Sequence, residues 1–240
     1  MNLVKAGYEI LTPIDGMAIL KHLEMIARVC YKSEDKITDE SCLKFIGMLI
    51  NRGHEAMIEH FNLSIKFICD RGVSHEIVRH RVASFGQEST RYCNYSKEKF
   101  GGEITFVMPC WFSENAKSLA NHYCIHEDGT YALTYNWITK DETIWLKQML
   151  SAEKAYKELL AGDYEEHQAP VRKWTPQEAR SVLPNSLKTE IVMTANMREW
   201  RHFFKLRTAE AAHSQMREIT IPLLLELKKL MPVIFDDINL

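Results

Sequence analysis

The chain has 240 residues, of which 46% are hydrophobic and 26% are charged, as in a globular protein with a sizeable core. Its formal net charge of -2 provides no overall basic field for non-specific nucleic-acid binding, so local groups must meet any anionic ligand. The first eleven residues lack the apolar core of a signal peptide and no apolar run could span a bilayer, which predicts a cytoplasmic protein without a membrane partner.

Two amphipathic helices are predicted near the start of the chain. Apolar residues recur at helical spacing over residues 15–31, where Asp15 is the predicted N-cap. The pattern returns over residues 39–52, between Thr38 as the cap and Gly53 as the end.

The periodicity then changes to strict alternation over residues 61–67, which predicts a half-buried strand. Residues 69–72 are predicted to break this strand. Ser74 would then cap a further helix, with Val78 and Val82 on the face that meets the core.

The second half of the chain is predicted to be mainly helical. The aromatic-rich stretch 93–136 yields only a short helix over 115–122. The other periodic segments are a long helix over 141–161 that ends at Gly162, a short helix over 176–182 between Thr175 and Pro184, a strand over 187–194, and a helical C-terminal third with a bend at Pro222. No repeat or linker marks a boundary, so we expect one domain over residues 1–240.

An arginine cluster is the segment with the clearest chemical character. Arg79, Arg81 and Arg91 lie within thirteen residues and are interleaved with hydroxyl and amide side chains. Planar guanidinium forks suit a bidentate anion such as a phosphate, although a solvated basic helix end is the alternative. On a continuous helix, Glu76 and His80 would share a polar face with Arg79, which favours the wall of a pocket.

The spacing of this cluster resembles a family signature. Arg79, His80 and Arg81, then seven residues, then Ser89 are similar to the motif of flavin-dependent thymidylate synthases, and the following Arg91 extends the match. Further segments resemble the family in the same order: Gly53-His54-Glu55, Arg180 to Pro184, Asn196-Met197-Arg198, His202 to Arg207, and His213-Ser214-Gln215. The resemblance covers most of residues 45–220.

The resemblance implies an α+β fold in which a central twisted sheet is flanked by helices, with residues 93–137 as a candidate family-variable insertion. It implies synthesis of dTMP from dUMP, with FAD as cofactor and with NADPH and 5,10-methylenetetrahydrofolate as co-substrates. It also implies a homotetramer whose active sites are shared between subunits.

The resemblance also assigns site residues. The implied contacts to dUMP are Glu76, Arg79, Gln87, Glu88, Ser89, Thr90, Arg91, Arg180 and Arg207. The implied contacts to FAD are His54, Ala56, Arg79, His80, Arg81, Gln87, Asn196, Met197, Arg198 and His202. Arg207 is the implied catalytic residue, because a permanently charged guanidinium can stabilise negative charge on a uracil ring.

Three positions depart from the family pattern. Glu76 stands where glutamine is expected, Gly86 where asparagine is common, and Ala56 where threonine or serine is usual. A carboxylate beside a phosphate would repel it, so we expect Glu76 to be ionised and paired with an arginine.

Other functions are less well supported by the sequence. Zinc helices place two histidines four residues apart, whereas His75 and His80 are five apart and His54 and His60 are six apart, so no metal is expected. No GxSxG elbow supports a hydrolase, and the acidic balance disfavours RNA binding. A nucleotide-binding flavoprotein without methyl transfer is the remaining alternative.

The six cysteines show no CxxC pair and are expected to be reduced thiols. Cys93 alone lies near the arginine cluster, two residues after Arg91, where a cation could activate a thiolate. The resemblance nevertheless implies a reaction without a cysteine adduct.

Overall fold

The computed structural model describes residues 1–113, 138–162 and 172–240, and it divides into two compact units. The first unit comprises Met1–Ala6, Ile68–His75 and Gln87–Glu190, and the second comprises Gly7–Phe67, Glu76–Gly86 and Ile191–Leu240. The helix expected over residues 115–122 lies outside the described residues.

A four-stranded sheet contributes most of its residues to the second unit. Its strand order is β2-β3-β6-β4, from β2 (Gly7–Ile10), β3 (Asn62–Asp70), β6 (Lys188–Asn196) and β4 (Ala83–Gln87). Burial alternates along β3 and β6, as expected for strands with one face against a core. Both strand predictions are therefore confirmed, and each strand extends beyond its predicted end.

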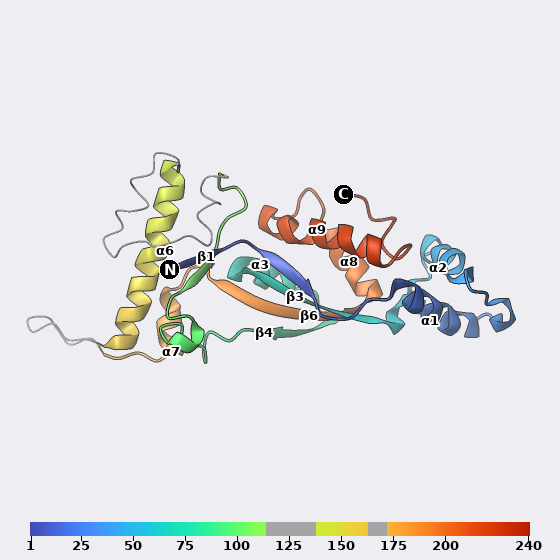
Figure 1. Ribbon diagram of the computed structural model, residues 1–240, viewed down its shortest axis with the longest axis horizontal. Coiled ribbons are helices and arrows are strands. Elements are labelled where there is room, and N and C mark those ends of the chain that lie inside the picture. Colours follow the sequence, from blue (N-terminus) through green and yellow to red (C-terminus); the bar gives the residue numbers. More distant parts are fainter. Residues whose placement is uncertain (114–137, 163–171) are drawn as a thin grey trace, which may run out of the picture. The chain divides into compact units, whose positions relative to one another are not determined.

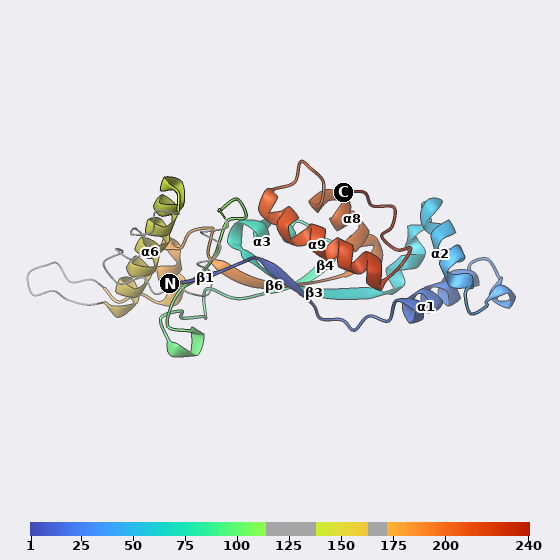
Figure 2. The same ribbon diagram turned by 45° about the horizontal axis from the view of Figure 1, so that its top comes forward.

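Two helices cover one face of this sheet. Helices α8 (Met197–Arg207) and α9 (Ser214–Leu230) lie on the same side of β3 and β6 in both views (Figures 1 and 2). Their apolar side chains Trp200, Phe203 and Leu223 are fully buried. The predicted C-terminal helices are confirmed, and α9 continues through Pro222 to Leu230.

The N-terminal helices of the second unit also match the prediction. Helix α1 (Gly16–Val29) begins after Asp15, whose side chain accepts a hydrogen bond from the Ala18 backbone N–H. Helix α2 (Ser41–Asn51) has Glu40 and not Thr38 as its N-cap, so the predicted cap was wrong. The 3-10 segments η1 (Glu34–Lys36) and η2 (Glu55–His60) follow α1 and α2 respectively.

The structure corrects the predicted helix after β3. Helix α3 (Arg71–Ile77) begins directly after the strand, where Asp70 accepts a hydrogen bond from the Val73 backbone N–H, and it ends before residue 78. Val78 and Val82 are exposed instead of facing the core, and the chain then enters β4. Pairing within the sheet outweighs the weak helical spacing of a few apolar residues.

The first unit is built around the long helix α6 (Lys140–Ala161). Gly162 ends this helix at φ 65°, as its sequence predicts, and a Thr139–Glu142 capping box that was not predicted begins it. Strand β1 (Asn2–Val4) pairs in parallel with β5 (Thr105–Val107), and their side chains join the same buried cluster as α6. The short elements are η3 (Glu98–Phe100), α7 (Pro176–Ala179) and η4 (Arg180–Val182). None of the helices in the described ranges has the length and apolarity needed to cross a membrane.

Arg201 is the most deeply buried cation of the second unit. Its side chain is 1% exposed, and it forms a bidentate pair with Asp237 at 2.6 and 2.7 Å. It also donates to Glu55 at 3.0 Å, so one guanidinium joins α8 to η2 and to the C-terminal segment. The hydrogen bonds from Arg201 hold the pKa of Asp237 below its usual range.

Replacing Arg201 with Met should lower the free energy of unfolding by about 3 kcal/mol, because two carboxylates would lose their partner. Urea denaturation of the two proteins measures the difference. Lys154→Ala, at an exposed position of α6, is the control and should change stability by less than about 0.5 kcal/mol. A loss below about 1 kcal/mol for Arg201→Met would mean that the cluster is not a major stabilising contact.

Candidate active site

Arg207 is the last residue of α8, and its guanidinium meets the end of α3 and the residues that follow it. Its Nε donates to Nε2 of His80 at 3.0 Å. Its Nη1 donates to a carboxylate oxygen of Glu76 at 3.0 Å, and its Nη2 donates to the Glu76 backbone carbonyl at 2.9 Å. The expected pairing of Glu76 with an arginine is present, and it fixes the direction of the guanidinium plane.

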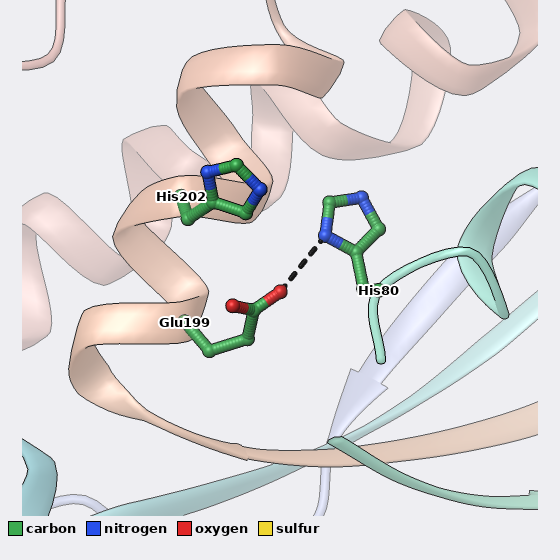
Figure 3. Close-up of side chains that lie close together, drawn as sticks. All are labelled: His80, Glu199 and His202. Carbon is green, nitrogen blue, oxygen red and sulfur yellow. Dashed lines mark hydrogen bonds and ion pairs between the residues drawn. The ribbon is translucent and has the colours of Figure 1, made fainter. Parts of the chain in front are cut away.

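His80 forms the centre of this arrangement. Its Nδ1 lies 3.0 Å from Glu199 Oε1, and the His202 ring is 5.6 Å away between centroids (Figure 3). Burial lowers the pKa of His80, and the charge of Arg207 and the neighbouring His202 lower it further, whereas Glu199 opposes them. The lowered pKa favours the neutral form of the ring.

His80, Glu199 and His202 also form a group with metal-ligand chemistry, since their ligand atoms lie within 4.8 Å of one another. The sequence did not suggest this group because the partners of His80 are more than a hundred residues away along the chain. They approach only because α8 packs beside the segment after α3.

A hollow of about 530 Å³ opens beside these side chains in the second unit. Its lining residues are Glu55, Glu59, Val82, Asn196, Arg198, Glu199, His202 and Lys205. Asn196, Arg198 and His202 were predicted from the sequence, whereas the other five were not. The missed residues are mainly glutamates, which an expected anionic ligand gave no reason to select.

The hollow has the size and donor groups of a cofactor site. Small-molecule sites are typically about 300–1,000 Å³ with a few polar groups that orient the ligand. Arg198, Lys205 and His202 supply N–H donors, and Arg198 is also paired with Glu59 at 2.7 Å. Together with three glutamates, these donors suit a polar ligand, and three of the lining residues are among those that the resemblance assigns to FAD.

The other predicted cofactor contacts of the second unit lie in different surroundings. His54 Nδ1 is 3.0 Å from the Tyr31 hydroxyl, and Ala56 is exposed. Arg79 and Arg81 are exposed, and no residue of the described ranges hydrogen-bonds to either side chain. Met197 has no exposed area and packs in the core, so its side chain does not face the hollow.

The first unit contains the predicted phosphate contacts. Arg180 Nη1 donates to the Thr90 hydroxyl at 3.0 Å, although ninety residues separate them. The Ser89 hydroxyl accepts from the Arg91 backbone N–H at 3.3 Å, and the Arg91 guanidinium lies 5.5 Å from the Tyr92 ring centroid. A hydroxyl, a buried threonine and two guanidinium groups therefore lie along this segment.

Gln87 and Glu88 have partners within the first unit. Gln87 Nε2 donates to the hydroxyls of Ser74 and Thr189 at 2.9 and 3.2 Å. Glu88 accepts from Lys188 Nζ at 3.2 Å. The Gln87 carbonyl oxygen is thus the group of that side chain left for a ligand.

Comparisons with known proteins match the chain to one family model and to relatives that all carry the same enzyme name. A family model described as "Thymidylate synthase complementing protein" matches residues 14–233. A flavin-dependent thymidylate synthase of Corynebacterium aurimucosum is 30% identical over 229 residues, which cover 91% of this chain and 79% of the relative. One of Pyrococcus abyssi is 32% identical over 200 residues, covering 82% and 67%, and one of Geobacter sulfurreducens is 28% identical over 236 residues, covering 92% and 85%.

Proposed function

The chain belongs to the flavin-dependent thymidylate synthase family of methyltransferases, and on that basis we propose its complete reaction. A methylene group passes from 5,10-methylenetetrahydrofolate to C5 of dUMP and is reduced by FADH2, giving dTMP and tetrahydrofolate. NADPH regenerates the reduced flavin. The product is a precursor of DNA, which is consistent with a cytoplasmic location.

The observation that best supports this function is the geometry of Arg207. A guanidinium has five N–H donors, and the three bonds to His80 and Glu76 leave one hydrogen on each terminal nitrogen. Those hydrogens remain available to donate to a uracil oxygen. Their fixed positive charge favours ionisation of the ring, which makes C5 nucleophilic without a covalent enzyme adduct.

We propose that the hollow of the second unit holds part of the FAD, with Asn196, Arg198 and His202 as direct contacts. A bound flavin supplies the hydride for the reduction. The Asn196 side chain accepts from the Glu199 backbone N–H at 2.9 Å, so the start of α8 holds these contacts rigidly. The proposed FAD contacts also include His54, Ala56, Arg79, His80, Arg81, Gln87 and Met197. Met197 would contribute through packing alone.

For the dUMP phosphate, we propose Ser89, Arg91 and Arg180 as the main contacts. Charge-assisted hydrogen bonds from arginine suit phosphate oxygens, and a hydroxyl adds a neutral donor. The Arg180–Thr90 bond holds one guanidinium beside this segment before any ligand binds. The proposed contacts to dUMP also include Glu76, Arg79, Gln87 and Glu88.

The family resemblance also supports a homotetramer with shared active sites, which we propose for this chain. We propose further that the two compact units together make one family domain. The matched range of residues 14–233 includes parts of both units, which supports this view.

The purified protein should be yellow or should take up FAD, because the proposed contacts would jointly hold an anionic dinucleotide. The visible absorption spectrum and an FAD titration measure this property. Oxidation of NADPH that depends on dUMP then distinguishes the synthase from a flavoprotein without methyl transfer. A colourless protein that binds no FAD would contradict the assignment.

Arg207→Ala should lower dTMP formation about a hundredfold or more, since a lost charge-assisted contact in a dry site costs about 3 kcal/mol. Arg207→Lys should fail as well, because one ammonium cannot serve His80, Glu76 and the substrate together. Arg52→Lys on the exposed end of α2 is the matched control. Wild-type turnover of Arg207→Lys would remove the proposed role.

The surroundings of Cys93 favour a packing role. Its side chain is partly buried against the apolar cluster of the first unit, and its backbone N–H donates to the Ser89 carbonyl. Cys42 and Cys69 are buried, and burial raises the pKa of Cys69 to about 12, which makes it a poor nucleophile. Cys124 lies outside the described residues.

Cys93→Ala, and a folded variant without cysteine, should retain dUMP-dependent turnover within about tenfold, because only packing changes. Steady-state rates at saturating FAD measure the effect. The mechanism would be overturned if folded, FAD-loaded Cys93→Ala were inactive and mass spectrometry of the wild-type protein trapped a dUMP adduct on a cysteine.

A further inference from the structure

Three side chains of the second unit form a hydrogen-bonded series from Glu199 through His80 to Arg207. Nδ1 of His80 is 3.0 Å from Glu199 Oε1, and Nε2 of the same ring is 3.0 Å from Arg207 Nε (Figure 3 for the first contact). We propose that Glu199 is a positioning residue, which acts through His80 to direct the Arg207 guanidinium. The proposal rests on the proposed function, in which Arg207 meets the pyrimidine.

The donor and acceptor roles in the series follow from the chemistry of arginine. A guanidinium only donates hydrogen bonds, so Nε2 of His80 must be the unprotonated, accepting nitrogen. A neutral ring then carries its hydrogen on Nδ1. That hydrogen needs an acceptor, and the Glu199 carboxylate supplies it.

The environment of the ring favours the neutral form that this series requires. His80 is 4% exposed, and the ring of Phe203 lies 4.9 Å away in an edge contact. The charged or titratable groups that face it are Glu199, Arg207 and His202. Two of these are cationic or can become so, and they disfavour a second proton on the ring.

The position of Glu199 in α8 gives a second indication of its role. Asn196 and Glu199 occupy the N-cap and third positions of the helix, where a glutamate often returns a hydrogen bond to the N-cap backbone. The Asn196 side chain does accept from the Glu199 backbone N–H. The Glu199 carboxylate instead contacts His80, which is 119 residues earlier in the chain.

Metal binding by His80, Glu199 and His202 is the competing explanation of this cluster. A metal ligated through Nδ1 would have to displace the hydrogen that Nδ1 carries, while Nε2 still accepts from Arg207. The ring would become an imidazolate or would lose the Arg207 contact. The nearby guanidinium also repels a cation, so the geometry favours the hydrogen-bonded series.

The first test measures the His80 tautomer in the ligand-free wild-type protein. The protein is labelled with ¹⁵N-histidine, and long-range proton–nitrogen correlation spectra are recorded. The signals of His80 are assigned by their loss in His80→Asn. They should show a neutral ring that is protonated on Nδ1. Zinc added to this sample should leave the His80 signals unchanged. An Nε2-protonated ring, or stoichiometric zinc binding that shifts these signals, would overturn the proposal whatever the enzyme catalyses.

The second test compares Glu199→Ala with Glu199→Gln. The glutamine carbonyl can still accept from Nδ1, so this variant should keep the tautomer and a kcat within about threefold of wild type. Glu199→Ala should give a mixture of tautomers and a kcat lower by about tenfold to a hundredfold at saturating FAD and dUMP, because a misdirected guanidinium loses alignment. Glu210→Gln, at an exposed position, is the control.

The same experiment distinguishes a variant that does not fold from a failure of the Glu199 positioning role and from a failure of the proposed function. Circular dichroism melting identifies any variant that is not folded, and the wild-type tautomer needs no variant at all. A folded, FAD-loaded Glu199→Ala protein with wild-type kcat would refute the positioning role and leave the synthase assignment intact. A wild-type protein that lacks dUMP-dependent turnover would instead refute the proposed function.

Discussion

The Arg207 guanidinium is the charge around which the second unit is arranged. A part-buried guanidinium that cannot lose its proton must have its donors satisfied, and three of them are satisfied by two residues of one short segment. This requirement explains why Glu76 and His80 both face α8. It also explains how a carboxylate is tolerated where glutamine is usual, because Glu76 balances the arginine charge directly.

The local structure after β3 makes this arrangement possible. Asp70 holds the first turn of α3, and the helix ends at Ile77, so residues 78–82 lie between a helix and the following strand. If the helix had continued through residue 80, helical geometry would have fixed the angle between the Glu76 and His80 side chains. The early end of the helix frees His80 to turn its two nitrogens toward different partners on α8.

The hollow beside His202 mixes acidic and basic side chains, and this balance has a physical consequence. Glu59 pairs with Arg198, and Glu55 pairs with the buried Arg201, so two of the three glutamates of the lining are paired with cations in or next to it. Paired carboxylates keep basic side chains ordered without giving the site a large net charge. A polar ligand of the hollow can then exchange hydrogen bonds with groups that are already in place.

The sequence by itself determined the elements whose signals are local. Periodicity and caps gave α1, α6 and the alternating strands β3 and β6, because an apolar stripe and a capping side chain act within a few residues. Motif spacing indicated the family, and it also selected Arg207, His80 and Asn196 as candidate site residues. Strands β1, β2 and β5 were not predicted, since strands of three or four residues carry too little pattern to detect.

Only the tertiary structure decided the contacts between distant segments. The helix predicted through Val78 and Val82 was wrong because sheet pairing of residues 83–87 outweighed a short helical spacing. The role of Glu199 was not visible from the sequence, where an asparagine and a glutamate three residues apart indicate a capping box. Its contact with His80 exists because α8 packs on the sheet beside the end of α3, and hydrogen-bond partners across such a distance are fixed by packing alone.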